Sequence, residues 1–268
     1  MKPILSLGLK LAPLLKHALM ALCLLLMTLR LGLAWWVQQP LVSPRTAVLL
    51  VAWLGLAVST VFTLFKKFRP WRKPVLWTYL TVFALGLGWF FSLPAKQDRA
   101  WAPEVAKQLH YERDGNTITL HNVRNFDWHT ETDYTERWET RRYDLNQITG
   151  INVITSYWMG PQIAHTLISF DFNNQAPLVF SIEIRKEKTE EFSTLGGFFR
   201  KFELSLIAAD EKDIIYTRSN VRGEQVYFFP VAMPKPEMRA LFEEYLKKSA
   251  KDLQILLISQ TEVLPEYD

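Results

Sequence analysis

The stretch HTLISFDFNNQAPLVFSIEI, residues 165–184, decides the fold expected for the second part of this chain. Apolar and polar residues alternate on both sides of NNQAP (residues 173–177), with the two-residue period of β-strands. The apolar side chains fall on even-numbered positions: Ile168, Phe170, Phe172, Leu178, Phe180, Ile182 and Ile184. Because NNQAP is typical of a turn, the stretch predicts an antiparallel hairpin with one apolar face.

The apolar pattern also restricts the register of this hairpin. Facing apolar rows require paired residue numbers with an even sum, so His165 lies opposite Glu183 or diagonal to it. A carboxylate beside a histidine can fix the ring tautomer and raise its basicity, which makes His165 and Glu183 candidate catalytic residues. The alternative is an ordinary cross-strand pair on a solvated face. Spacing alone leaves both interpretations open.

Residues 94–268 contain further strand patterns and one long helix pattern. The strand patterns occupy residues 111–123, with a turn at Asp114-Gly115, and residues 151–157, 203–209 and 224–231. Residues 189–202 are typical of a short helix weakened by Gly196 and Gly197. Pro236 opens a helix whose apolar residues follow helical spacing. We therefore expect residues 94–268 to form one α+β domain with a largely antiparallel sheet.

The first part of the chain is a membrane region. Three apolar runs, residues 18–37, 46–65 and 75–93, have the length of about 20 residues that crosses a bilayer as a helix. The first run has no small-residue cleavage site, so we expect a retained helix and not a signal peptide. Arg30 interrupts this run, either as a functional intramembrane charge or as a side chain that reaches the interface.

Positive charges predict the orientation of these helices. The loop KKFRPWRK (residues 66–73) holds five of them, whereas the loop between the first two helices holds only Arg45. The positive-inside rule places residues 66–73 and the N-terminus in the cytoplasm, so everything after Leu93 is exported. In a bacterium this predicts a multi-pass inner-membrane protein with a periplasmic domain. The basic residues flank apolar runs, and we therefore expect no nucleic-acid partner.

Few residues outside the hairpin suggest chemistry. The only cysteine, Cys23, lies in the first apolar run, so the exported part has no disulfide. The spacing of His110, His121 and His129 matches no common metal site, and we expect neither a metal nor a cofactor. Residues 122–145 are dense in Arg, Asn, Asp, Tyr and Trp, which is typical of a polar groove or of a buried hydrogen-bond network.

Several sequence blocks resemble a known family. They are HNVRNF (residues 121–126), TDYTERWETRRYDL (132–145), SYWMGPQIAHTLISF (156–170) and SIEIRKE (181–187). They are similar to blocks of the Lnb-type N-terminal periplasmic domain, a family that contains a bacterial lipoprotein N-acyltransferase. The similarity runs from about Trp101 to the last residue. It implies a papain-like, circularly permuted fold of the NlpC/P60 type, in which His165 matches the family's histidine.

The resemblance also implies a thiol nucleophile. In the family, the helix that corresponds to residues 236–260 is followed by an Asn-Cys-Thr motif, whereas this sequence ends in LPEYD (residues 264–268). We therefore expect either a truncated enzyme or a natural form without a nucleophile. Candidate substrate contacts within the blocks are Arg124, Asn125, Trp158 and Arg185.

The function implied by the resemblance is thiol-dependent acyl transfer to a lipoprotein or another lipid-linked substrate at the bilayer. Two alternatives remain open at this point. One is a non-catalytic, membrane-anchored binding module, and the other is a peptidase or amidase that acts on the cell wall. The sequence does not indicate an oligomeric state.

Overall fold

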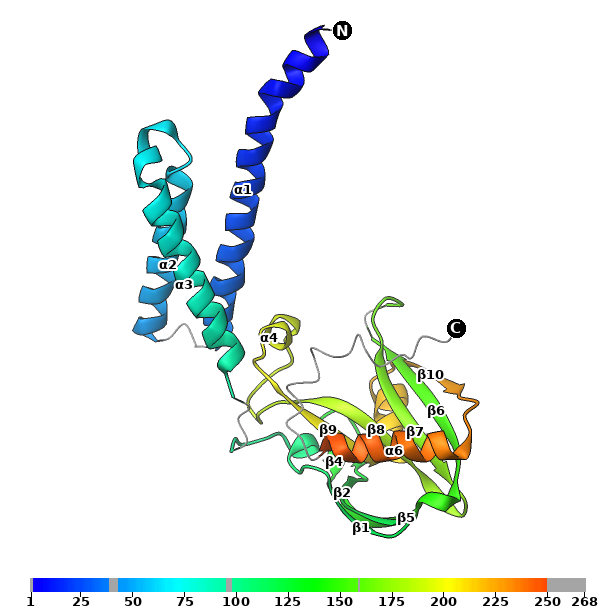
Figure 1. The fold of residues 1–268 in the computed structure, drawn as a ribbon. Helices are drawn as coiled ribbons and strands as arrows, with labels where there is room; N and C mark the ends of the chain where they lie inside the picture. The colour runs from blue at the N-terminus through cyan, green and yellow to red at the C-terminus, as the bar shows by residue number, and fades with distance from the viewer. Residues whose placement is uncertain (1, 39–42, 95–97, 159, 250–268) are drawn as a thin grey trace. The chain divides into compact units, whose positions relative to one another are not determined.

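The computed structural model describes residues 2–38, 43–94, 98–158 and 160–249, and it divides into two compact units (Figure 1). The helical unit consists of Met1–Pro94 together with Ser193–Lys201. The sheet unit consists of Ala95–Phe192 and Phe202–Asp268. The segment Ser193–Lys201 interrupts the sheet unit in sequence but packs with the helices.

The helical unit contains α1 (Lys2–Gln38), α2 (Pro44–Phe62) and α3 (Arg72–Ser92), with a short 3₁₀ helix, η1 (Lys66–Trp71), before α3. Three helical segments are long and apolar enough to cross a membrane: Leu15–Gln38, Pro44–Phe62 and Lys66–Ser92. Many large apolar side chains on these helices are exposed, as expected for surfaces that face lipid. The three apolar helices predicted from the sequence are therefore confirmed.

Close contacts hold the three helices together. Trp53 of α2 stacks on Tyr79 of α3 at 4.6 Å between ring centroids, and the Tyr79 hydroxyl lies 2.8 Å from Thr28 Oγ1 of α1. Gly86 of α3 has no side chain, which leaves room for Leu31 of α1: a Cβ at this position would lie 2.5 Å from Leu31 Cδ1. Small residues and buried polar contacts are the usual means of helix packing in membranes.

Ser193–Lys201 adds a fourth element to the helical unit. Its short helix α4 (Thr194–Phe198) begins with Ser193 Oγ accepting from the backbone N–H of Gly196, and it is followed by Phe199, which is 2% exposed. Phe199 packs with Ala34 of α1 and Phe90 of α3. The Gln38 side chain donates to the carbonyls of Phe199 and Arg200, at 2.7 and 2.8 Å. The helix predicted in residues 189–202 is thus a single short turn attached to α1 and α3.

The sheet unit is built on an eight-stranded sheet. Seven strands follow the order β1-β2-β9-β8-β7-β6-β10, and β5 also pairs with β2. Their bounds are β1 (His110–Asp114), β2 (Thr117–Arg124), β5 (Trp138–Asp144), β6 (Ile148–Tyr157), β7 (His165–Phe172), β8 (Gln175–Arg185), β9 (Glu203–Asp210) and β10 (Gln225–Pro230). All pairs are antiparallel except β2 with β9. A separate two-stranded sheet joins β3 (Asp127–Trp128) to β4 (Tyr134–Thr135).

The central hairpin β7–β8 has the register in which His165 faces Glu183. Leu167 pairs with Ser181 and Phe170 with Leu178, so the paired numbers have the expected even sum. The turn itself is shorter than NNQAP: Phe172 pairs with Gln175, the register shifts before it, and Asn174 adopts a positive φ of 59°. The turn therefore has two residues, and the β-bulge next to it restores the even-sum register in the rest of the hairpin.

Helices cover both faces of the sheet. The even-numbered face packs on α6 (Lys235–Ser249), whose Met238, Phe242 and Leu246 are buried against Phe170 and Phe180 (Figure 1). The odd-numbered face packs on α5 (Glu211–Tyr216), where Ile214 contacts a cluster that includes Leu167 and Val179. The prediction of an α+β fold with a largely antiparallel sheet is confirmed.

The odd-numbered face is partly covered, which bears on the alternative of a solvated face for His165 and Glu183. Their side chains are only 21% and 19% exposed, and the catalytic role of the pair stays a prediction. The sequence analysis also missed β3, β4 and β5, and it missed α5 with the π-helical turn η4 (Thr217–Val221) that follows it. Three short 3₁₀ or π segments complete the unit: η2 (Pro103–Val105), η3 (Leu145–Gln147) and η4.

Candidate functional site

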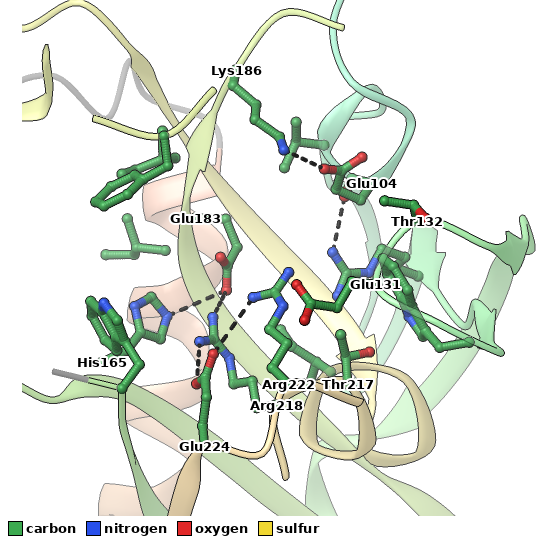
Figure 2. Close-up of a pocket in the computed structure, with 18 residues that line it drawn as sticks. Glu104, Glu131, Thr132, His165, Glu183, Lys186, Thr217, Arg218, Arg222 and Glu224 are labelled. Atoms are coloured by element: carbon green, nitrogen blue, oxygen red, sulfur yellow. Dashed lines mark hydrogen bonds and ion pairs between the residues drawn. The ribbon is translucent and has the colours of Figure 1, made fainter. Parts of the chain in front are cut away.

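A pocket of about 510 Å³ is lined by His165 and Glu183 of the odd-numbered face of the sheet (Figure 2). Strand β7 contributes His165 at its first residue, and β8 contributes Glu183. The α5–η4 segment forms another wall with Ile214, Thr217 and Arg218. The pocket therefore brings together residues that lie far apart in the sequence.

The histidine is linked to the carboxylate by an ion-pair contact and through a serine. His165 Nε2 lies 2.7 Å from Ser181 Oγ and 3.3 Å from Glu183 Oε1. Ser181 donates its hydroxyl proton to Glu183 Oε1 over 2.6 Å. Ser181, on the same strand as Glu183, thus bridges the two residues.

This arrangement fixes the tautomer of His165. An ionised carboxylate only accepts hydrogen bonds, so the Ser181 hydroxyl must donate to Glu183 and accept from the histidine. His165 Nε2 therefore carries a proton, and the lone pair of the neutral ring lies on Nδ1. Among the described residues no hydrogen bond to Nδ1 is present. The ring consequently offers a proton acceptor that no other described group occupies.

Glu183 is kept ionised by its surroundings. Burial opposes its charge, but the Arg218 guanidinium, His165 and the Ser181 hydroxyl together hold the pKa of Glu183 well below its usual range. Arg218 Nη2 donates to Glu183 Oε1 over 2.7 Å. The carboxylate is therefore ionised at neutral pH and can orient the imidazole.

Arg218 is itself held between two carboxylates. Its Nη1 lies 3.3 Å from Glu224 Oε2, and Ser156 on the neighbouring strand β6 also donates to that oxygen. Burial lowers the pKa of Arg218, but the charges of Glu183 and Glu224 outweigh it and raise the pKa. The chain of contacts Ser156–Glu224–Arg218–Glu183 thus leads to His165, as Figure 2 shows for its labelled members.

The α5–η4 segment that carries Arg218 is fixed by a second ion pair. Asp213, which is fully buried, accepts two hydrogen bonds from Arg124 at 2.8 and 3.0 Å. The same carboxylate accepts from the Phe126 backbone N–H and from Trp128 Nε1. Such bidentate pairs are geometrically specific. Asp213 therefore joins α5 to the end of β2 and to β3.

The remaining pocket wall mixes charged and apolar groups. Lys186 Nζ lies 3.3 Å from Glu104 Oε1, and Arg222 Nη1 lies 3.8 Å from Glu224 Oε1. The apolar lining side chains are Val105, Trp128, Trp158, Ile182, Ile184, Phe192 and Ile214. The pocket therefore offers both apolar and charged contacts to a ligand.

The residues predicted for substrate contact fall in different places. Trp158 lines the pocket, is 44% exposed, and has its ring centroid 6.5 Å from that of His165. Arg124 also lines the pocket, but its guanidinium is bound to Asp213. Asn125 donates to Glu139 and Arg185 donates to the carbonyls of Val105 and Ala106, and neither residue lines the pocket.

The sequence analysis missed three residues that are linked to His165 by hydrogen bonds or ion pairs: Ser181, Arg218 and Glu224. Ser181 was detectable, since it shares the odd-numbered face two residues before Glu183. Arg218 and Glu224 were not, because they lie in and after a π-helical turn that has no strand or helix periodicity. Within the described part of the chain, no group of three His, Cys, Asp or Glu side chains could hold a metal ion.

Comparison with known proteins gives one match to a family model. No curated protein and no solved structure matches the chain. A family model described as the Lnb N-terminal periplasmic domain matches residues 134–254, a segment that begins at β4 and includes His165 and Glu183. The match and the three apolar helices indicate a membrane protein with a periplasmic domain. The family of this model is the one that the sequence blocks resemble.

Proposed function

We propose that this protein is an inner-membrane, thiol-dependent acyltransferase whose periplasmic domain N-acylates lipoproteins or a related lipid-linked amine. We further propose that the domain is papain-like, with His165 as its general base. The family match supports the reaction class, and the apolar helices keep such a domain at the bilayer surface where lipid-linked substrates lie.

The observation that carries the proposal is the hydrogen-bond geometry at His165. Because Nε2 donates to Ser181 and lies next to Glu183, the basic nitrogen is Nδ1. Glu183 also stabilises the imidazolium that forms when Nδ1 accepts a proton. A histidine held by a carboxylate on one nitrogen and open on the other is the arrangement that activates a thiol.

The proposed reaction has two steps. His165 Nδ1 takes the proton from a cysteine thiol, and the thiolate attacks the carbonyl carbon of an acyl ester. The C–O bond breaks, the imidazolium returns the proton to the leaving alkoxide, and an acyl thioester remains. In the second step the amine of the acceptor attacks the thioester, an amide forms, and the amine's proton passes through His165 to the leaving thiolate.

The thiol in this proposal comes from outside the 268 residues. Cys23 is their only cysteine, and it lies in α1 within a candidate membrane span. We propose that the family's Asn-Cys-Thr motif is supplied by a further part of the polypeptide. The mixed lining around Trp158 and Lys186 would then receive the acyl chain and the polar end of the substrate.

The test is the state of lipoprotein N-termini in cells that carry the native gene. We expect that His165→Gln causes free N-terminal amines to accumulate, as deletion of the gene would, with the protein still present in the membrane. The matched control is His121→Gln, because His121 forms a similar 3.3 Å pair with Glu112 on an exposed hairpin. Wild-type levels of N-acylation in the His165 variant would exclude it as the base. Unchanged lipoproteins after deletion would favour the cell-wall hydrolase or the binding module.

A further inference from the structure

Arg30 is a positive charge inside a candidate membrane span, and its own unit offers it no acidic partner. Neither residues 1–94 nor residues 193–201 contain an aspartate or a glutamate. Arg30 Nη1 is buried and has no hydrogen-bond partner among the described residues. Such a group in an apolar environment is costly and usually marks a binding interaction.

Aromatic rings surround the guanidinium. Its central carbon lies 4.4 Å from the ring centroid of Phe90, 4.8 Å from that of Phe199 and 5.8 Å from that of Phe198. These contacts stabilise a cation through the ring faces, but they provide no hydrogen-bond acceptor. The rings therefore position Arg30 without satisfying its hydrogen-bond donors.

The site lies near one end of the helices. Phe90 belongs to the last turn of α3, and the segment that carries Phe199 is bound to Gln38, the last residue of α1. A second guanidinium, that of Arg200, lies 5.7 Å from the same Phe90 ring and donates to the carbonyls of Phe90 and Leu93. Helix ends lie at the depth of the lipid headgroups, so both charges lie close to the level of the headgroup phosphates.

We propose that Arg30, with Arg200 next to it, binds the phosphate of an anionic glycerophospholipid at the end of α1 and α3. Arginine forks are suited to phosphate oxygens, and the anion would supply the negative charge that the unit lacks. Exposed apolar side chains beside the site, Phe91 and Phe198 at 59% and 70% exposed, would contact the acyl chains. This lipid site is separate from the His165 pocket and does not depend on the proposed catalytic activity.

The experiment measures binding of phosphatidylglycerol to the full-length protein in dodecyl maltoside micelles, followed by the thermal midpoint. We expect phosphatidylglycerol to raise the midpoint of the wild-type protein, whereas diacylglycerol with the same chains and inorganic phosphate do not. Arg30→Gln should weaken phosphatidylglycerol binding by roughly ten- to a hundredfold, the loss expected for one charge-assisted hydrogen-bond partner. Arg45→Gln is the matched control, because Arg45 is an exposed arginine in the first turn of α2.

Each outcome decides the proposal. Equal binding to wild type and Arg30→Gln would overturn it, as would equal stabilisation by diacylglycerol, which lacks the phosphate. Equal stabilisation by inorganic phosphate would identify a site for a free anion and would also overturn the lipid assignment. If Arg30→Gln does not fold, Arg30→Lys retains the charge without the planar fork and should bind phosphatidylglycerol more weakly than wild type. Undiminished binding in that variant would count against the proposal.

Discussion

At His165, one serine determines which ring nitrogen can act. The Ser181 hydroxyl has a single proton, and the ionised Glu183 requires it, so the histidine must donate through Nε2. The sequence predicted the pairing of His165 with Glu183 from strand parity alone. Parity also places Ser181 on this face, but it could not predict that the hydroxyl bridges the two residues, because this depends on the distance between two strands. It could not predict Arg218, which lies on a segment folded over them.

Glu183→Gln tests the orienting role of the carboxylate. An amide cannot stabilise the imidazolium, so we expect acyl transfer to fall by roughly a hundredfold or more. Assay of lipoprotein N-acylation in membranes checks this, with Glu112→Gln as the control because Glu112 pairs with His121 on the surface. Activity within a factor of two of wild type would contradict the role.

The same substitution has a pH-dependent effect on stability. The folded-state pKa of Glu183 lies below its unfolded value, so its stabilising contribution is present above about pH 4.3 and is lost as the pH falls through the folded pKa. The thermal midpoints of wild type and Glu183→Gln should therefore differ at neutral pH and converge in acid. A difference that grows toward low pH would contradict this sign.

At the scale of elements, α5 and η4 depend on a few buried polar contacts. The sequence has no periodic signal for Glu211–Val221, and polar contacts such as those of Asp213 with Arg124 and Trp128 fix its position together with the packing of Ile214. Strand β5 was missed for a related reason: residues 138–144 are mostly polar, and their side chains form ion pairs such as Arg141 with Glu139 and Asp210. Hydrophobic patterns do not predict helices and strands whose position depends on ion pairs.

Asp213→Asn should release the α5–η4 segment. The change leaves the buried Arg124 without its counter-charge, and breaking a buried ion pair costs about 3–5 kcal/mol. Thermal unfolding should show a lower midpoint, and hydrogen exchange in residues 211–221 should accelerate. Asp127→Asn, at an exposed position of β3, serves as the control. Equal midpoints for the two variants would argue against the role of Asp213.

Two glycines of α3 provide a test of helix packing. A Cβ at Gly86 would meet the fully buried Leu31, whereas a Cβ at Gly88 would meet nothing within 4 Å. Alanine favours a helix over glycine by about 1 kcal/mol at either site. We therefore expect Gly88→Ala to be neutral or stabilising and Gly86→Ala to lower the thermal midpoint in detergent. The opposite order would contradict the contact between α1 and α3.

At the scale of the whole molecule, charge predicts topology. The positive loop at residues 66–73 and the three apolar helices predict that the sheet unit lies outside the cytoplasm. A C-terminal alkaline phosphatase fusion should therefore be active, and a C-terminal green fluorescent protein fusion should be dark. A fusion placed after Lys73 should give the reverse result. Fluorescence from the C-terminal fusion would contradict the predicted orientation.

The segment Ser193–Lys201 has a practical consequence for any attempt to isolate the periplasmic domain. A polypeptide that starts at residue 95 would retain Phe198 and Phe199 but would lose Ala34 and Phe90, against which Phe199 packs. The shortened protein would expose two phenyl rings to water and would tend to aggregate or to require detergent. Truncation at the end of the last membrane span, the usual choice for a tethered domain, therefore cuts through a folded unit. A soluble version would need the segment between β8 and β9 replaced by a short polar loop.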